Sequence, residues 1–100
     1  MYTYEIIKLL NLSEGWGKAC DQVQDAAYNT MTVNQWNAFA IRQKRDIMQG
    51  EGSDFIVFNG HYYDWKEFDF KTTEIVTAYL SYFSEEQLKK ILAYLQKRSK

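Results

Sequence analysis

Apolar residues recur at helical spacing in the first third of the chain and predict two helices there. Within residues 3–11 the polar residues Glu5 and Lys8 interrupt the apolar pairs Ile6-Ile7 and Leu9-Leu10. This spacing is typical of a short helix with one buried side. Ser13, a residue type that favours the N-cap position, precedes a second stripe, which the polar pair Asn29-Thr30 is expected to end. Its apolar members fall at offsets 0, 3, 4, 7, 10 and 11, which is one helical face: Trp16, Ala19, Cys20, Val23, Ala26 and Ala27.

A third helix is predicted to begin after Thr32, because Gln35 three places later completes a capping box. Its apolar side carries Val33, Trp36, Phe39, Ala40 and Ile47. The helix is expected to run through residues 33–49 and to stop at two glycines, Gly50 and Gly52, because glycine is favoured just beyond a helix C-terminus.

The aromatic stretch 55–65 has Asn59-Gly60 near its centre, which is a strong signal for a tight β-hairpin, because a type I′ turn needs positive φ at both central residues. A two-residue loop predicts the pairs Phe58–His61, Val57–Tyr62, Ile56–Tyr63 and Phe55–Asp64. Strand alternation then puts Ile56, Phe58, His61, Tyr63 and Trp65 on one face, and Phe55, Val57, Tyr62 and Asp64 on the other. An isolated hairpin is marginal in water, so at least one face must pack on helices, but alternation does not say which.

Two helices are predicted after the hairpin. The first spans residues 72–83, with Asp69 as its expected cap and with apolar residues Ile75, Val76, Tyr79, Leu80 and Phe83. The second opens with a capping box formed by Ser84 and Gln87. It carries a clean apolar stripe: Leu88, Ile91, Leu92 and Leu95.

These elements predict an α+β fold that is mostly α. Three helices, one hairpin at about 54–65 and two C-terminal helices are expected in a single compact domain of residues 1–100. The order of three helices followed by a hairpin resembles the winged-helix arrangement. That resemblance lies in element order, and it implies a DNA-binding role only by analogy.

Composition narrows the class of protein. The chain has 100 residues, 46% of them apolar, and a net charge of −1, which indicates a folded domain with no bulk attraction to nucleic acid or acidic membranes. The first residues lack the basic region and apolar run of a signal peptide, and no run approaches the 18 apolar residues that a membrane span needs. We therefore expect a cytoplasmic protein, in a bacterial cell or a host cell.

The candidates for catalysis are few. Cys20 lies in an apolar stripe, where a free cysteine is usually a core residue, and His61 stands beside the predicted turn. No second His or Cys stands at metal-ligand spacing, and the carboxylates of Asp64, Glu67 and Asp69 are typical of a solvated surface. We expect no enzyme activity, no cofactor and no metal.

The third helix is a candidate for DNA binding, since it would enter the major groove in a winged-helix protein. Arg42 and Arg45 are expected on its exposed side, with Asn34 and Gln35 placed to read base edges. The alternative is a solvated helix face that carries an ion pair between Arg42 and Asp46.

The hairpin and its flanks favour a protein partner instead. Residues 51–74 hold six carboxylates and two lysines, a local charge of −4, whereas a wing that lies along phosphates should be basic. Tyrosine and tryptophan are enriched at protein interfaces. The predicted contact residues form an acidic aromatic ribbon: Tyr62, Tyr63, Asp64, Trp65, Glu67 and Asp69. The partner is expected to present a basic surface, as nucleic-acid enzymes do.

The sequence therefore predicts a non-catalytic protein-binding module that acts as an inhibitor or adaptor, with a winged-helix DNA-binding regulator as the alternative. Its proline-free, Tyr-, Lys- and Asn-rich composition is similar to that of accessory proteins from phages and mobile elements of low-GC bacteria, some of which block host defences. Two further alternatives stay open. In the first, the loop at 66–71 folds over the second hairpin face and covers it. In the second, the protein forms a homo-oligomer, in which either the aromatic ribbon or the final helix (88–95) pairs with its own copy.

Overall fold

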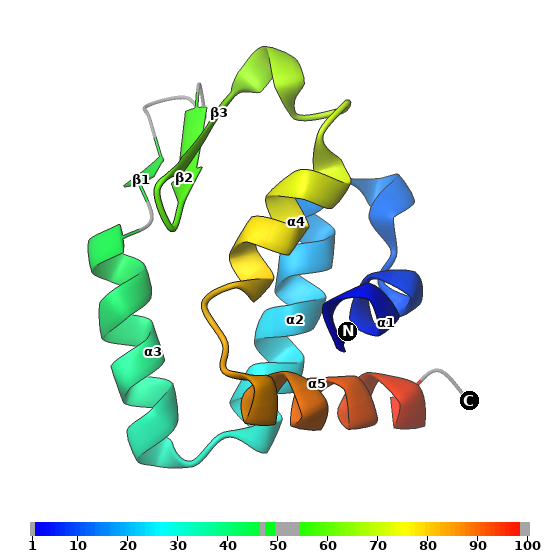
Figure 1. Ribbon diagram of the computed structural model, residues 1–100, viewed down its shortest axis with the longest axis vertical. Coiled ribbons are helices and arrows are strands. Elements are labelled where there is room, and N and C mark those ends of the chain that lie inside the picture. The colour runs from blue at the N-terminus through cyan, green and yellow to red at the C-terminus, as the bar shows by residue number, and fades with distance from the viewer. Residues whose placement is uncertain (1, 47, 50–54, 99–100) are drawn as a thin grey trace.

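The computed structural model describes residues 2–46, 48–49 and 55–98, and the side chains of residues 45–46 and 48–49 lie outside that description. The fold is α+β and mostly α, as predicted (Figure 1). The α-helices are α1 (Tyr2–Leu9), α2 (Trp16–Thr30), α3 (Val33–Asp46), α4 (Thr72–Leu80) and α5 (Glu85–Arg98). The other elements are the strands β1 (Met48–Gln49), β2 (Phe55–Phe58) and β3 (His61–Asp64) and the 3₁₀ turns η1 (Leu12–Glu14) and η3 (Trp65–Glu67). Their order is compatible with a winged-helix arrangement. No helix among these residues is long and apolar enough to cross a membrane.

The hairpin of β2 and β3 has the predicted register. All four expected pairs are observed: Phe55–Asp64, Ile56–Tyr63, Val57–Tyr62 and Phe58–His61. Asn59 and Gly60 have φ angles of 49° and 85°, as a type I′ turn requires. The turn is also anchored to the segment after α4, since the backbone N–H of Asn59 donates to the Tyr82 hydroxyl at 2.7 Å.

One face of the hairpin packs on the helices. Ile56, Phe58 and Tyr63 are buried, whereas His61 and Trp65, which alternation assigns to the same face, are exposed. His61 lies next to the turn and lines a cavity together with Thr77 and Ala78 of α4, and Trp65 lies in η3 after the end of β3. The choice between the two faces, which alternation leaves open, is thus made by packing.

A short third strand was not predicted. β1 pairs antiparallel with β2, Met48 opposite Val57 and Gln49 opposite Ile56, where the helix was expected to continue to residue 49. The pairing with β2 satisfies backbone groups that a helix would have satisfied internally. Ile47 and the expected stop residues Gly50 and Gly52 lie outside the described residues.

Two of the four helix caps proposed from sequence are confirmed. Thr32 and Gln35 form the capping box of α3, and Ser84 and Gln87 form that of α5. Ser13 is not the cap of α2, however. It lies in η1, and Gly15, with a φ of 97°, occupies the N-cap position instead.

The remaining helix limits also differ from the predictions. Asp69 is not the cap of α4, because Lys71 takes that position without a side-chain cap. α4 ends at Leu80 rather than at residue 83. α2 continues through Thr30, whose hydroxyl donates to the carbonyl of Ala26 at 2.8 Å.

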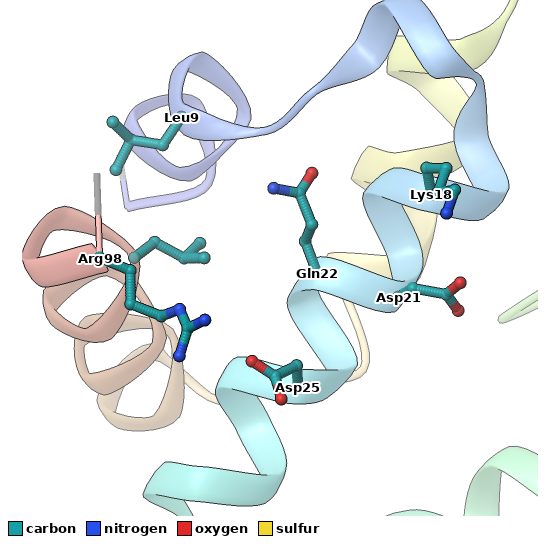
Figure 2. Close-up of a pocket in the computed structure, with 7 residues that line it drawn as sticks. Leu9, Lys18, Asp21, Gln22, Asp25 and Arg98 are labelled. Carbon is teal, nitrogen blue, oxygen red and sulfur yellow. The ribbon is translucent and has the colours of Figure 1, made fainter. Parts of the chain in front are cut away.

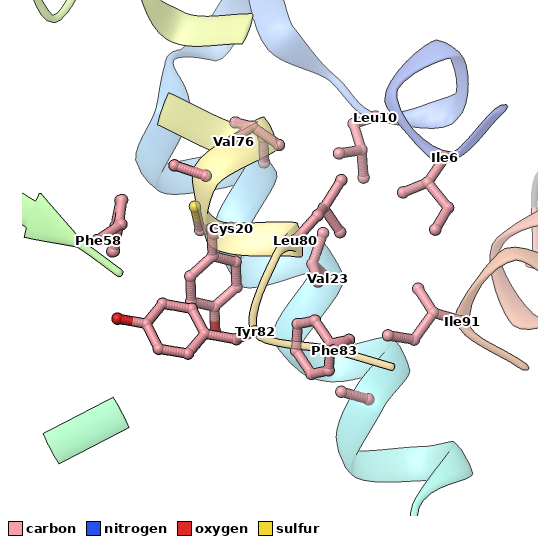
Figure 3. Packing of buried hydrophobic residues seen from close by; sticks show 14 of the residues in the cluster. Ile6, Leu10, Cys20, Val23, Phe58, Val76, Leu80, Tyr82, Phe83 and Ile91 are labelled. Carbon is pink, nitrogen blue, oxygen red and sulfur yellow. The ribbon is translucent and has the colours of Figure 1, made fainter. Parts of the chain in front are cut away.

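The core lies among α1, α2, α4 and α5, with the inner hairpin face added to it (Figure 3). Its largest fully buried side chains are Ile6, Val23, Ile75, Val76, Leu80 and Ile91. The apolar side of α5 packs against α1 and α2, since Leu88, Ile91, Leu92 and Leu95 are all buried. That helix therefore has no free apolar side for pairing with a second copy, contrary to one of the sequence-based alternatives.

α3 stands apart from this core (Figure 1). Among its described side chains only Phe39 is buried, at 6% exposed. Its ring stacks on Phe83, with centroids 4.7 Å apart, and meets Tyr79 and Tyr82 edge-on. On the opposite side of the helix Ile41 is 68% exposed. Phe39 is thus the buried anchor of α3 among the side chains that the structure describes.

We expect Phe39→Ala to lower the free energy of unfolding by about 3 kcal/mol, because the substitution removes a buried ring and leaves a cavity. Urea denaturation followed by circular dichroism measures this. The control on the same helix is Ile41→Ala, for which a change within about 0.5 kcal/mol is expected. Equal effects of the two substitutions would contradict the role assigned to Phe39.

Candidate functional site

The outer face of the hairpin presents aromatic surface to solvent. Tyr62 is 59% exposed and stacks on Phe55, with ring centroids 5.5 Å apart and an interplanar angle of 24°. Val57, on the same face, is half-buried. One face of the Tyr62 ring is thus covered by Phe55. The rest of the side chain stays accessible to solvent.

Tyr63 does not belong to this surface, although the sequence placed it among the contact residues. It is only 8% exposed, and its hydroxyl donates to the backbone carbonyl of Glu74 at 3.4 Å. Burial, followed by the nearby Glu74 carboxylate, raises the pKa of its hydroxyl. Strand alternation already separates Tyr62 from Tyr63, and packing on α4 decides that Tyr63 is the one that points inward.

The turn η3 presents Trp65. Asp64 accepts a hydrogen bond from the backbone N–H of Lys66 at 3.0 Å, and Glu67 accepts one from the backbone N–H of Asp64 at 3.2 Å. The two carboxylates therefore form a capping box around a single helical turn. Trp65 lies inside this turn and is 56% exposed. Asp64 and Glu67 thus shape the surface that displays the indole.

Part of the acidic flank is paired with a lysine. Glu67 forms an ion pair with Lys71 at 3.2 Å, and Lys71 also lies 3.9 Å from Glu74. The hydrogen bond from Asp64, then the one from Lys71, lowers the pKa of Glu67, and the bond with Glu67 raises the pKa of Lys71. Asp69 is exposed. Of the six carboxylates that give residues 51–74 their charge of −4, Glu51 and Asp54 lie outside the described residues.

Phe70 was missed by the sequence reasoning. It is 88% exposed, whereas Phe68 packs edge-on against Trp16 with centroids 5.6 Å apart. Trp16 also meets Phe58 on the inner face of the hairpin. Phe68 therefore packs toward the inner side of the hairpin, and Tyr62 stays 59% exposed, so residues 66–71 do not cover it, contrary to one alternative above. Alternation of Phe68 and Phe70 around Asp69 was the available signal, but it appears in a segment without regular structure.

Cys20 and His61, the two candidates for catalysis, lie in different environments. Cys20 is buried, and burial, followed by the charge of Asp21, raises the pKa of its thiol to about 12. The core position predicted for Cys20 is thus confirmed. His61 is exposed beside the hairpin turn. Within the described residues no three His, Cys, Asp or Glu side chains come close enough together to hold a metal ion.

The residues proposed for DNA contact differ in their surroundings, as far as the structure describes them. Arg42 was expected to be exposed, but its guanidinium lies 4.8 Å from the centre of the Tyr82 ring and donates to the Tyr82 carbonyl at 3.3 Å. Gln35 uses its carbonyl oxygen in the cap of α3, and Asn34 is exposed. The side chain of Arg45, and that of Asp46 with which Arg42 was expected to pair, lie outside the described residues.

A cavity of about 500 Å³ lies between α1, α2 and α5 (Figure 2). Several of its polar groups are joined to one another or to neighbouring residues. The Tyr94 hydroxyl donates to Asp25 at 3.1 Å and accepts from Arg98 at 3.0 Å, and Gln22 accepts from the backbone N–H of Asn11 at 2.8 Å. These bonds connect α2 to α5 and to the start of η1, which gives the groups a structural role.

The well-exposed aromatic side chains of residues 62–70 are Tyr62 on the outer hairpin face, Trp65 in η3 and Phe70 after it, and we call this set, with Phe55 stacked on Tyr62, the outer aromatic surface. No family model matches this chain, and no match to it is found among curated proteins or solved structures. The function is therefore argued from this surface and its surroundings.

The thiol of Cys20 is expected to resist alkylation in the folded protein. A rise of its pKa from 9.0 to about 12 lowers the thiolate fraction at pH 8 on the order of 1000-fold, and the thiolate is the nucleophile. Incorporation of iodoacetamide at pH 8, followed by mass spectrometry with and without urea, measures the protection. Equal rates in the two conditions would contradict a buried thiol.

Glu67 makes the stability depend on pH. Because its pKa is lowered in the folded state, its contribution is present above the ordinary value of 4.5 and is lost as the pH falls below it. Urea denaturation should therefore show Glu67→Gln to be less stable than the wild type at pH 7 and nearer to it at pH 3. Asp69→Asn, in the same segment, is the control and should change stability by less than about 0.5 kcal/mol at both pH values. A destabilisation by Glu67→Gln that is the same at pH 3 and pH 7 would contradict this origin.

Proposed function

We propose that this protein is a non-catalytic protein-binding module that acts as an inhibitor or adaptor, and that it contacts its partner through the outer aromatic surface. Seven large hydrophobic side chains in the described part of the chain are well exposed, and three of them, Tyr62, Trp65 and Phe70, lie within nine consecutive residues. Exposed aromatic residues that are concentrated in one segment are typical of an interaction site. This concentration is the observation that carries the proposal.

The way in which the aromatic side chains are held supports this use. Tyr62 is stacked on Phe55, and Trp65 sits in a turn that Asp64 and Glu67 cap. A side chain that is already ordered loses less conformational entropy when it binds, so these residues are pre-organised for contact. Tyr62 and Trp65 are therefore both exposed and ordered before binding, so that less of their binding energy is lost to the entropy cost of ordering them.

The charge of the segment suggests which partner would fit. Asp64, Glu67, Asp69 and Glu74 outnumber Lys66 and Lys71, so the surroundings of the aromatic side chains are mildly acidic. A partner with a basic surface, such as a nucleic-acid enzyme, would be attracted to it. The composition favours an inhibitor over an adaptor. The expected target is a host defence enzyme, as for some accessory proteins of phages and mobile elements.

DNA binding through α3 is less well supported. One of its two charged candidates, Arg42, is held against Tyr82 by a hydrogen bond and a cation–π contact. Asn34 is exposed, yet Gln35 already engages the backbone of Thr32. A DNA-reading helix needs several outward-facing groups that act together.

The proposal is tested with the tagged protein in a pull-down from nuclease-treated bacterial lysate. We expect one protein partner to be retained, and we expect Tyr62→Ala and Trp65→Ala each to weaken its binding by about 30-fold, which is typical of an aromatic hot spot. Binding of the purified partner, measured by surface plasmon resonance, provides that comparison.

Tyr4→Ala is the matched control, because Tyr4 is also well exposed but lies on α1. Its affinity for the partner should equal that of the wild type. A partner that binds the Tyr62 and Trp65 variants as tightly as the wild type would exclude the outer aromatic surface. In a parallel pull-down from lysate without nuclease, retention of nucleic acid without protein, with release at higher salt, would favour α3 instead.

A further inference from the structure

β3 forms one edge of the three-stranded sheet (Figure 1). In a hairpin with a two-residue turn, the pair next to the turn exchanges both backbone hydrogen bonds, and every second pair does so from there. Ile56–Tyr63 is therefore a bonded pair, whereas the N–H and C=O groups of Tyr62 and Asp64 point away from β2. The hydrogen bond from the Asp64 N–H to the Glu67 carboxylate, at 3.2 Å, agrees with this direction.

Tyr62 is the open position of this edge. Asp64 already serves as the N-cap of η3, with its N–H held by Glu67, so the end of β3 is occupied. The backbone N–H and C=O of Tyr62, by contrast, have no hydrogen-bond partner among the residues that the structure describes. A free donor and a free acceptor on one exposed strand edge match the backbone of another extended chain, which pairs with both of them.

A cavity of about 380 Å³ lies beside this edge. Its lining comes from β3 and α4 and includes His61, Thr73, Glu74, Thr77 and Ser81, the residue that ends α4. None of the four residues of β2 lines it, so the cavity adjoins β3 on the side that faces away from β2. An extended segment that paired with the open edge would therefore run along this cavity, between β3 and α4.

Two side chains of the cavity present acceptors to a ligand. The hydroxyl of Thr77 donates its proton to the carbonyl of Thr73 at 2.7 Å, which leaves its lone pairs free to accept. The Glu74 carboxylate is an acceptor as well. Lys71 lies 3.9 Å from it but forms its closer ion pair, at 3.2 Å, with Glu67. A carboxylate and a hydroxyl oxygen in one cavity fit a cationic donor, which in a protein is the side chain of lysine or arginine.

We propose that an extended segment of the partner protein adds to the sheet as a further strand beside β3. Its backbone exchanges two hydrogen bonds with Tyr62, and the residue opposite Tyr62 lies on the outer face beside that ring. Successive side chains point to opposite faces, so the next residue points to the inner side, where a lysine or arginine reaches Glu74 and Thr77. This inference rests on the proposed function, to which it adds the form and the charge of the bound segment.

The probe is selected from random decapeptides displayed on phage, with the full-length protein as the target. We expect enrichment of sequences in which a lysine or arginine stands next to an apolar or aromatic residue. The most enriched sequence is synthesised with a fluorescent label, and its dissociation constant is measured by anisotropy. Glu74→Gln should weaken its binding by roughly 10-fold, because the charge that faces the basic side chain is lost. Glu86→Gln, which makes the same change at an exposed position of α5, is the matched control and should bind like the wild type.

A comparison of Tyr62→Pro with Tyr62→Ala separates the backbone of this residue from its ring. Both substitutions remove the ring, but only proline also lacks the N–H group. Because the N–H of Tyr62 faces away from β2, proline at this position leaves the bonds between β2 and β3 intact, and circular dichroism verifies that both variants are folded. We expect Tyr62→Pro to bind the peptide roughly 3- to 10-fold more weakly than Tyr62→Ala does, which is the effect of one lost hydrogen bond.

Amide hydrogen exchange, followed by ¹⁵N NMR, observes the added strand directly. In the free protein the N–H of Tyr62 should exchange faster than that of Tyr63, which is bonded to Ile56 in the hairpin. The peptide should slow the exchange of the Tyr62 amide, because this group becomes a donor to the peptide backbone.

Any of three results would overturn the proposal: no enriched peptide, a peptide that leaves the exchange of the Tyr62 amide unchanged, or equal binding by wild type and Glu74→Gln. A Tyr62 amide that becomes protected in the free protein as its concentration rises would also overturn it, and would assign the edge to a second copy. Weak binding of Tyr62→Ala and Trp65→Ala, with no further loss in Tyr62→Pro, would keep the proposed function and exclude strand addition. A loss confined to Tyr62→Pro would keep strand addition and exclude the outer aromatic surface.

Discussion

The aromatic residues at the end of α4 hold the two projecting parts of this protein to its helical body. Phe39 of α3 stacks on Phe83, and the ring centroids of Phe58, in the hairpin, and Tyr79 are 5.4 Å apart. Tyr82 joins both parts, because its hydroxyl accepts from the hairpin turn and its ring and carbonyl hold Arg42. Buried rings cover a large area and pair edge-on, so a few of them can attach elements that share little other contact.

This junction also explains which surfaces stay open. Because the hairpin is attached through Phe58 and Tyr63, its other face, with Tyr62 on Phe55, is left toward solvent. Because α3 is attached through Phe39, its side toward α2 is closed only at the Trp36–Tyr28 contact, and a groove remains. Both surfaces thus have one cause, because each of these two elements is held to the helical body by one face only.

The capping box of η3 shows how acidic residues can act in such a surface without serving as its main contact. Asp64 and Glu67 accept backbone hydrogen bonds, and Lys71 neutralises part of their charge. Their first effect is to hold the turn that displays Trp65. Under the proposed function, the aromatic side chains would supply most of the binding energy, and the remaining charge would favour encounter with a basic partner.

The sequence by itself determined the features that depend on neighbours along the chain. The register of the hairpin follows from Asn59-Gly60, and the caps at Thr32 and Ser84 follow from a residue three places ahead. Helical spacing likewise identified the buried positions of α2, including Cys20. Such patterns are local, so that backbone sterics and hydrogen bonding decide them before any tertiary contact forms.

Tertiary structure decided what depends on residues far apart in sequence. Tyr63 points inward because α4 lies beneath β3, Arg42 turns away from solvent because Tyr82 is within reach, and Phe70 is exposed because Phe68 takes the place beside Trp16. Gln24 of α2 and Gln43 of α3 line the same space between the two helices, which stays open because α3 is anchored at Phe39. Packing, which depends on the arrangement of whole elements, makes these choices, and no local pattern carries that information.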